Sequence, residues 1–225
     1  MNRIKELNDR LKEEYGEPER PQEQSGMDYL IETVLSQNTN DVNRDRAFQQ
    51  FKDEFDSYRE VENADRERLA ETISTAGLGP TKAKRIQESL QIIREERGDY
   101  TLEFIEDLEI DEAKKWLTKL PGVGPKTAAI ILCFHFGKPV IPVDTHVHRV
   151  SKRLGLVPEN ASREKAHDIL EEKVPDGIKY EFHRLLITHG RETCTARNPD
   201  CENCVLKEGC RYYEEFVTGD RDPEG

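Results

Sequence analysis

The chain has 225 residues and a net charge of −12, with 35% hydrophobic and 36% charged residues. This composition predicts a soluble protein, and the longest apolar run, 128–134, is far too short to span a bilayer. No apolar targeting segment stands at the N-terminus, so we expect a cytoplasmic protein. An acidic chain repels phosphates as a whole, so DNA binding would require a locally basic region.

Helical periodicity runs through almost the whole chain. The first residues place Ile4, Leu7, Leu11 and Tyr15 on one helix face. Further amphipathic patterns follow in chain order at 26–37, 41–55, 65–76, 80–97, 111–119, 125–136, 144–154, 162–173 and 179–189. No alternating run is long enough to form a sheet, so an all-α fold is predicted.

The predicted helices have recognisable boundaries. Residues that favour N-caps stand near four helix starts: Asp41, Asp65, Asp111 and Ser162. Glycines stand near four helix ends: Gly98, Gly137, Gly155 and Gly190. The polar segment 218–225 is predicted to be a flexible tail.

Two glycine turns share the pattern GxGP. They are Gly77-Leu78-Gly79-Pro80 and Gly122-Val123-Gly124-Pro125, and a lysine-containing helix follows each. Both fit ordinary helix–helix turns, because glycine adopts unusual backbone angles and proline starts helices well. In the second turn, free N–H groups at the next helix start also predict an anion site. Such a site suits binding of a DNA backbone without reading its sequence.

Lys126 lies in the first turn of the helix after the second glycine turn. The helix dipole disfavours a cation at this end, and only a neutral amine attacks as a nucleophile. Lys126 is therefore a candidate nucleophile, with simple phosphate binding as the alternative. Lys82, after the first glycine turn, is the next lysine to consider.

Residues 120–153 carry five lysines or arginines and a single carboxylate, Asp144. Asp144 stands at a helix start, where an N-cap role would explain it. A carboxylate near a sugar would also stabilise the positive charge that develops at C1′ when a base leaves. His146 and His148 are two residues apart, so they point in different directions on a helix and form no metal pair. Contact with the phosphate backbone suits them better.

Four of the five cysteines form the pattern Cys194-x6-Cys201-x2-Cys204-x5-Cys210. Four thiolates this close can hold one zinc ion or an iron–sulfur cluster. Structural zinc sites typically use two CxxC pairs and this loop has one, which favours iron–sulfur modestly. The fifth, Cys133, lies in the apolar run and is predicted to be buried in the core.

Together these motifs resemble the endonuclease III family of base-excision DNA glycosylases. The matching segments are LPGVGPKTA at 120–128, VDTHVHRV at 143–150, His189-Gly190-Arg191, and the cysteine loop. The similarity runs from about Ser25 to Cys210. No single motif is specific, whereas their order and spacing are.

The resemblance implies a two-domain all-α helix-hairpin-helix fold with a DNA-binding cleft between the domains. A six-helix barrel would occupy 25–138, and a 4Fe-4S cluster domain would combine 1–24 with 139–217. The implied activity is that of a bifunctional DNA glycosylase and AP lyase. It flips an oxidised pyrimidine out of the duplex, forms a Schiff base on Lys126 with help from Asp144, and cuts the strand 3′ to the abasic site by β-elimination. The cluster ligands would be Cys194, Cys201, Cys204 and Cys210. With DNA as the implied partner, we expect a monomer that associates with the nucleoid in a prokaryote.

The resemblance also implies which residues contact double-stranded DNA at an oxidised pyrimidine or abasic site. They are Gly122, Val123, Gly124, Thr127, His146, Arg149, Gln37, Asn38 and Leu78. Leu78 matches an intercalating leucine, although Gly79-Pro80 after it departs from the family pattern. Asn38 stands where the family has a glutamine that fills the gap left by the flipped base, and Gln37 stands one position earlier. Both are candidates for that role.

Two other readings of the sequence are open. A monofunctional mismatch glycosylase of the same superfamily removes a base without cutting, but that group lacks a lysine at the hairpin position and has an extra C-terminal domain. A non-catalytic DNA-binding iron–sulfur protein would keep the hairpin and the cysteines. It would not need both Lys126 and Asp144.

Overall fold

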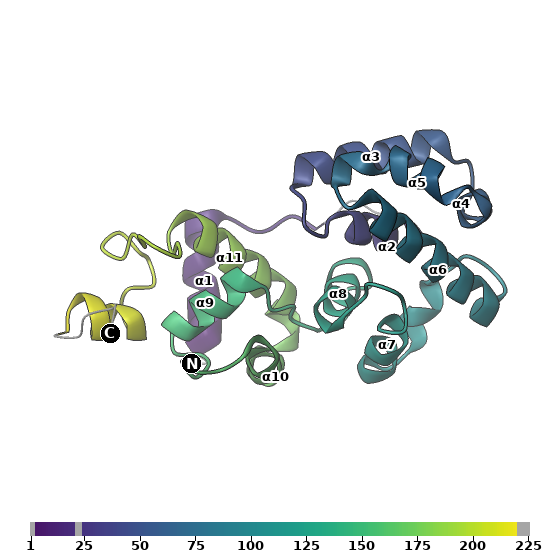
Figure 1. The fold of residues 1–225 in the computed structure, drawn as a ribbon. Helices are drawn as coiled ribbons and strands as arrows, with labels where there is room; N and C mark the ends of the chain where they lie inside the picture. The colour runs from purple at the N-terminus through teal and green to yellow at the C-terminus, as the bar shows by residue number, and fades with distance from the viewer. Residues whose placement is uncertain (1–2, 21–23, 220–225) are drawn as a thin grey trace. The chain divides into compact units, whose positions relative to one another are not determined.

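The computed structural model describes residues 3–20 and 24–219, and the chain divides into two compact units. One unit is Pro21–Phe136, and the other combines Met1–Arg20 with Gly137–Gly225. All regular secondary structure in the described ranges is helical, which confirms the predicted all-α fold (Figure 1). None of the described helices is long and apolar enough to cross a membrane. Of the predicted flexible tail, residues 220–225 lie outside the described part of the chain.

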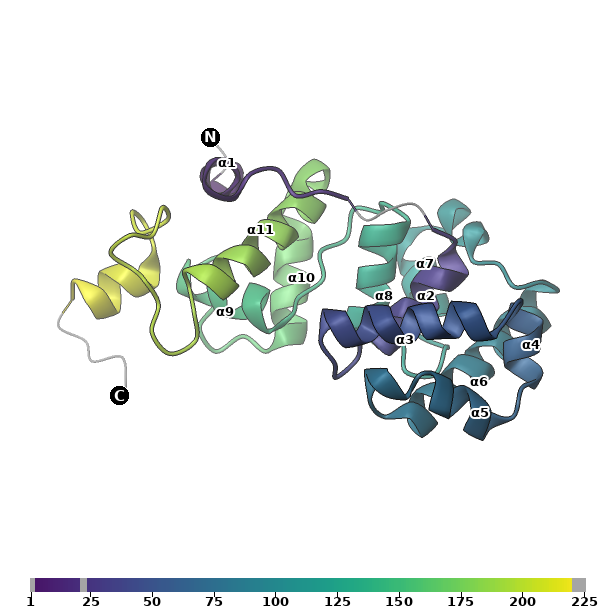
Figure 2. The same ribbon diagram turned by 90° about the horizontal axis from the view of Figure 1, so that it is seen from above.

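The unit Pro21–Phe136 is a set of short helices and one longer helix, α6 (Figure 2). In chain order it contains α2 (Gly26–Leu35), α3 (Asp41–Glu54), α4 (Tyr58–Asn63), α5 (Arg66–Thr72), the 3-10 turn η1 (Ser74–Ala76), α6 (Gly79–Arg97), the 3-10 turn η2 (Glu103–Asp107), α7 (Ile110–Leu117), α8 (Pro125–Ile130) and the π-helical turn η3 (Ile131–His135). Helices α2, α4 and α5 all contact α6. Large side chains such as Leu35, Ile86 and Leu90 are almost fully buried there, and each contributes about 1.5–3 kcal/mol of hydrophobic stabilisation.

The second unit joins the two ends of the chain. It contains α1 (Arg3–Tyr15), α9 (Thr145–Arg153), α10 (Arg163–Lys173), the 3-10 turn η4 (Asp176–Ile178), α11 (Lys179–Glu192) and the π-helical turn η5 (Tyr213–Val217). Helix α11 packs against both α1 and α9. Ile4, Leu7 and Leu11 belong to one buried cluster with residues of α9 and α11, which confirms the predicted apolar face of the first helix.

Several predicted boundaries are confirmed and others are wrong. Asp65 and Ser162 cap their helices with side-chain hydrogen bonds, as predicted. Asp41 is wrong by one residue, because its neighbour Asn40 is an equally good cap and accepts the hydrogen bond from Asn43 N at 2.9 Å. Asp111 is also wrong, because α7 already begins at Ile110.

The helix predicted for 125–136 changes its winding part of the way along. It is α-helical only to Ile130, and Ile131–His135 form a π-helical turn. Phe136 N donates to Ile131 O at 3.3 Å, the five-residue spacing of such a turn. Cys133 lies in this turn with 1% of its surface exposed, so its predicted core position is confirmed.

Candidate active site and metal centre

The hairpin between α7 and α8 is a tight turn with an open outer surface. Val123 N donates to Leu120 O at 3.0 Å, and the Val123 side chain is buried in the unit. Gly122 has φ 84°, in the left-handed region that favours glycine. Gly124 is extended, and a Cβ built on it would meet no atom within 4 Å. Close approach of another molecule is therefore unobstructed at Gly124.

Lys126 follows this hairpin as an exposed residue in the first turn of α8. Thr127 beside it is half-buried. Lys82 is very different, because it is 1% exposed and its Nζ donates to Leu35 O and Ala76 O, both at 2.8 Å. Burial, together with the nearby Arg85 charge, lowers the pKa of Lys82. The interpretation of Lys82 as a second candidate nucleophile is wrong, because no substrate atom can reach its amine.

Asp144 is the N-cap of α9, as its position predicts. Its Oδ1 accepts a hydrogen bond from Val147 N at 2.7 Å. The residue is half-buried and follows the buried Val143 in the chain. Its Oδ2 makes no hydrogen bond to any residue that the structure describes. Asp144 belongs to the unit formed by the chain ends, and Lys126 belongs to Pro21–Phe136. The cap fixes the carboxylate in place and leaves one oxygen for chemistry.

The two histidines after Asp144 point in different directions, as predicted. His148 Nε2 lies 2.8 Å from Ala161 O, whereas His146 Nδ1 lies 3.2 Å from Arg149 Nη2. Arg149 Nη2 also donates to Gly190 O at 2.7 Å, and its Nε donates to Cys194 O at 3.1 Å. Arg149 thus connects α9 with the end of α11 and the start of the cysteine loop. DNA contact by His146 and Arg149 stays a prediction.

The two turns predicted to enter DNA have unusual backbones. Asn38 has φ 55° and Leu78 has φ 53°, and no other described non-glycine residue has a positive φ. Left-handed backbone costs roughly 1–2 kcal/mol in a residue such as leucine, and asparagine tolerates it better. Leu78 is also 55% exposed, which is unfavourable for a large apolar side chain. Strain and exposure at one residue indicate a functional role rather than a packing role.

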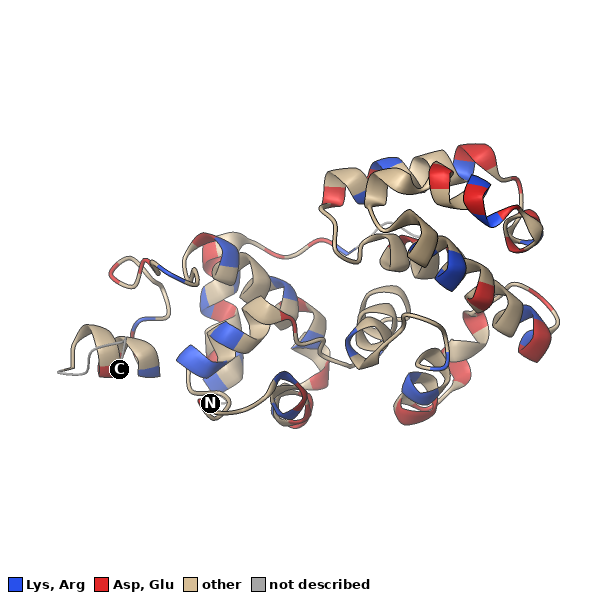
Figure 3. Cartoon of the chain, viewed as in Figure 1, with Lys and Arg blue, Asp and Glu red and all other residues tan. Residues whose placement is uncertain are grey.

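Charge is distributed unevenly along the chain. Acidic and basic residues alternate on α3 and α5, where red and blue segments intersperse (Figure 3). Arg44 of α3, for example, pairs with Glu32 at 3.2 Å and Asp45 at 2.7 Å. Helices α8 and α9 contain lysine and arginine but no carboxylate. Each of these two helices is therefore locally basic, despite the overall negative charge of the chain.

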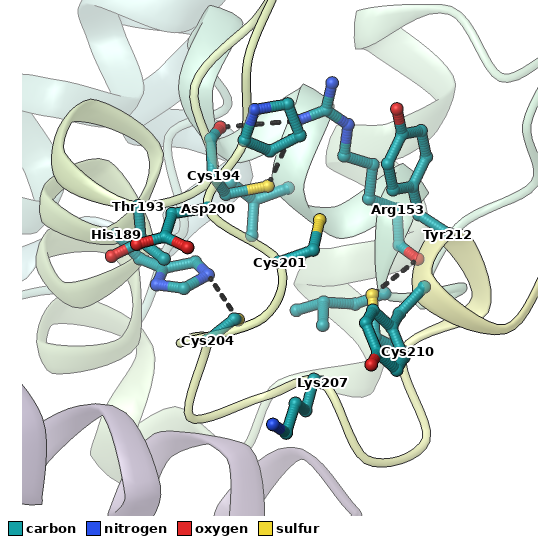
Figure 4. A pocket seen from close by; sticks show the side chains of 14 residues that line it. Arg153, His189, Thr193, Cys194, Asp200, Cys201, Cys204, Lys207, Cys210 and Tyr212 are labelled. Carbon is teal, nitrogen blue, oxygen red and sulfur yellow. Dashed lines mark hydrogen bonds between the residues drawn. The ribbon is translucent and has the colours of Figure 1, made fainter. Parts of the chain in front are cut away.

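The four clustered cysteines line one pocket beside α9 and α11 (Figure 4). Burial raises the pKa of the Cys204 thiol to about 11 and also raises the pKa of Cys210. Against this, Arg153 Nη1 lies 3.3 Å from Cys194 Sγ, and Leu206 N donates to Cys204 Sγ at 3.4 Å. Donors of this kind stabilise thiolates once a metal displaces their protons. The donor set and the shared pocket fit an iron–sulfur cluster.

The four cysteine side chains are arranged around the pocket that they line. Within residues 3–20 and 24–219, no three His, Cys, Asp or Glu side chains converge closely enough to form a site for a single metal ion. The four cysteines instead surround the space between them from different sides (Figure 4).

A hydrogen-bonded chain reaches this pocket from α1. Tyr15 Oη lies 2.7 Å from Thr193 Oγ1 and 2.9 Å from His189 Nδ1. His189 Nε2 in turn lies 3.6 Å from Cys204 Sγ. Burial lowers the pKa of His189 to about 4, so the ring is neutral at pH 7. A neutral ring that accepts from Tyr15 at Nδ1 presents its N–H to the sulfur.

Sequence reasoning missed the residues that support these sites. Tyr15 was assigned only to an apolar helix face, and His189 only to a motif before the cysteines. Arg85 was not singled out at all, yet its Nη1 donates to Gln37 Oε1 at 2.8 Å. These contacts join positions far apart in the chain, so local periodicity carries no signal for them.

Two family models match the chain. Residues 31–176 match the HhH-GPD superfamily of base excision DNA repair proteins, and residues 194–210 match the iron–sulfur binding domain of endonuclease III. The second match confirms the predicted iron–sulfur cofactor in preference to zinc.

Individual relatives give the same picture. The chain is 38% identical over 183 residues to an Arabidopsis thaliana protein named as a DNA glycosylase, and the match covers 81% of this chain and 60% of that protein. It is 36% identical over 191 residues to endonuclease III of Thermotoga maritima, with 85% of each chain covered. A solved structure of a trapped endonuclease III–DNA covalent intermediate is similar with a TM-score of 0.78 and 28% identity, covering 94% of this chain and 96% of that one.

Proposed function

Because this chain belongs to the HhH-GPD superfamily of base excision DNA repair proteins and to the endonuclease III family within it, we propose that it is a bifunctional glycosylase and AP lyase. Its proposed substrate is double-stranded DNA that contains an oxidised pyrimidine or an abasic site. The observation that carries the lyase activity is the exposed Lys126, two residues after Gly124, where close approach of another molecule is unobstructed. A monofunctional enzyme needs no amine at this position.

In the proposed reaction, the neutral amine of Lys126 attacks C1′ of the damaged nucleotide. A bond forms between Nζ and C1′, and the glycosidic bond breaks, so the base leaves with the bonding electrons and takes up a proton. The Asp144 carboxylate stabilises the positive charge that develops on the sugar. Its Oδ2 is available for this because the helix cap uses Oδ1.

The C1′–O4′ bond then breaks, with O4′ taking up a proton that Nζ gives up, and the Schiff base formed in this way makes the strand break possible. Loss of a proton from C2′ sends electrons toward C3′, and the C3′–O bond breaks with the 3′ phosphate as the leaving group. Water hydrolyses the remaining imine and regenerates Lys126. The trapped covalent complex of the related endonuclease III supports such an intermediate for this chain.

Cys194, Cys201, Cys204 and Cys210 are the proposed ligands of the 4Fe-4S cluster. When bound, the cluster supplies cross-links within residues 194–210 and a one-electron redox centre. The contacts of Arg149 and Arg153 with the Cys194–Ala196 backbone tie this loop to α9. The loop is thereby attached to the helix that Asp144 begins.

Borohydride trapping on a duplex containing thymine glycol tests the proposal. Wild type should form a covalent adduct, and Lys126→Gln should form none. Lys115→Gln, at an exposed position on α7 of the same unit, is the matched control and should trap like wild type. Base release without any adduct in wild type would show a monofunctional glycosylase. An adduct that persists in Lys126→Gln would assign the nucleophile to another amine.

A further inference from the structure

The two helical segments that precede the strained turns each end in a carbonyl group, and the Lys82 side chain binds both of these carbonyl groups. Leu35 is the last residue of α2, three positions before Asn38, and Ala76 is the last residue of η1, two positions before Leu78. The buried Nζ of Lys82 donates to both carbonyl oxygens at 2.8 Å. Helix ends leave such carbonyls without partners, and a cation is well placed there. Lys82 therefore connects the two segments that lead into the left-handed residues.

Arg85 lies three residues after Lys82 on α6. It connects this region with the glycine hairpin that contains Gly122. Its Nη1 donates to Gln37 Oε1 at 2.8 Å, and Gln37 Nε2 donates to Gly122 O at 2.9 Å. The Gln37 side chain thus forms a bridge from α6 to the glycine hairpin. All these residues belong to the unit Pro21–Phe136.

The same bridge separates the roles of Gln37 and Asn38. Gln37 is half-buried, and both ends of its amide are engaged. Asn38 is exposed, and its side chain makes no hydrogen bond to any described residue. Insertion of Gln37 into DNA would break two hydrogen bonds, whereas insertion of Asn38 breaks none.

A purely structural role would not call for a lysine at position 82. Burial of an ammonium group in a core is unfavourable, and a methionine or leucine would fill the same space without that cost. The hydrogen bonds of the Lys82 amine justify its burial only if the two carbonyl groups must be held at fixed positions. The residues that follow those carbonyls, Asn38 and Leu78, are the ones with strained backbones.

We propose that Lys82 and Arg85 are positioning residues that hold Asn38 and Leu78 ready for insertion into a damaged duplex. In this proposal, which rests on the function proposed above, Asn38 is the residue that fills the place of the flipped base. Gln37 holds the glycine hairpin against α6 in this arrangement. The free protein already has the turns in their inserting conformation, so binding spends no free energy on ordering them.

Lys82→Met tests the positioning role, with Lys84→Met as the matched control. Lys84 is exposed on the same helix, and its nearest ion-pair contact is with Glu88 at 3.8 Å. Two quantities are measured: hydrogen exchange in peptides that cover 34–40 and 74–79 of the free protein, and the ratio of Kd values for undamaged duplex and for a duplex with a tetrahydrofuran abasic analogue. Lys82→Met should speed exchange in both peptides and lower the Kd ratio at least tenfold. Lys84→Met should change neither.

Arg85→Met provides a second variant in case Lys82→Met fails to fold. Arg85 is only half-buried, so this variant should keep the fold. It should speed exchange at 36–40 and 120–125 and lower the Kd ratio. An unchanged Kd ratio in either variant overturns the proposal, whether exchange is faster or unchanged, because a merely structural residue would lower stability without changing lesion selectivity.

The assignment of Asn38 is tested separately with Asn38→Ala and Gln37→Ala. A 2-aminopurine placed opposite the abasic analogue reports displacement of the orphaned base. Asn38→Ala should lose the fluorescence change with normal exchange in the free protein, and Gln37→Ala should retain it but exchange faster at 120–125. The reverse pattern overturns the assignment. If wild type shows neither trapping nor lesion selectivity, the proposed function fails, and the exchange data alone then decide whether Lys82 holds the turns.

Discussion

A Cβ atom built on Gly122 would lie 2.6 Å from Cδ of Arg85, closer than side-chain carbons approach one another. The arginine therefore occupies space that is open only because residue 122 has no side chain. Gly122 also has φ 84°, so two independent features require glycine there. Gly124 has neither feature, since it is extended and its Cβ would meet nothing.

The first prediction contrasts these two glycines. Gly122→Ala should lower the free energy of unfolding by roughly 1–2 kcal/mol, the cost of left-handed backbone, and should displace Arg85 from Gln37. Gly124→Ala should change it by less than about 0.5 kcal/mol. Urea unfolding followed by fluorescence of Trp116, the single tryptophan, measures both. Equal losses in the two variants would contradict this reading of the hairpin.

The second prediction separates the two roles of Asp144. Asparagine caps helices as well as aspartate does, so Asp144→Asn should keep the cap and remove only the charge. Its unfolding free energy should stay close to that of wild type while base release slows by at least tenfold. Asp144→Ala should lose both, with a stability cost of about 1 kcal/mol. Wild-type base release by Asp144→Asn would reduce Asp144 to a structural cap.

The third prediction concerns the chain Tyr15–His189–Cys204. An N–H donated to a cluster sulfur stabilises the more electron-rich state and raises the reduction potential. Tyr15→Phe removes the partner of His189 Nδ1, so it should lower the potential of the bound cluster. Redox titration of the visible absorption band checks this. Tyr180→Phe is the control, because the Tyr180 hydroxyl donates to Glu19 O instead of contacting His189, and it should leave the potential unchanged.

The fourth prediction concerns pH and Glu62. Hydrogen bonds from Arg94 and Tyr100 hold the pKa of Glu62 below its usual value of 4.5. A carboxyl group with a depressed folded pKa stabilises the protein above its unfolded pKa, and this contribution is lost as pH falls through the folded pKa. The difference in unfolding free energy between wild type and Glu62→Gln should therefore be constant from pH 5 to 7 and shrink as pH falls below about 4.5. Glu71→Gln, at an exposed position on α5, should show no such pH-dependent difference from wild type.

Local chemistry made part of this structure predictable. Asp144 was identified as a cap because a short carboxylate before a helix has few other backbone roles. Cys133 was placed in the core because isoleucine, leucine and phenylalanine surround it in the chain. The cysteine loop was recognisable because its ligands lie within one short segment.

The features that were not predicted have no signal in the local sequence. In the sequence, Lys82 looks like an ordinary helical lysine. Its role depends on the Leu35 carbonyl, 47 positions away in the chain, which the fold places next to its amine. The sequence predicts only that Leu78 lies in a turn. Its left-handed backbone is set by the way the chain passes from η1 into α6, and the types of its neighbouring residues do not predict it. The change from α to π winding at Ile131 has no marker in the apolar run that contains it.

The union of Met1–Arg20 with Gly137–Gly225 has a consequence for synthesis on the ribosome. The unit Pro21–Phe136 has its core partners within one continuous stretch, so it can fold while the rest of the chain is still being made. Helix α1 is made well before α11 but must wait for it, because Leu7 and Leu11 are buried against Phe182, Leu185 and their neighbours. The cysteine loop follows α11 directly, so its four thiols are present together only after α11 has been made. Truncation before Lys179 would thus leave α1 without α11, whereas truncation between Glu192 and Cys210 would keep that partner and remove the proposed cluster ligand Cys210.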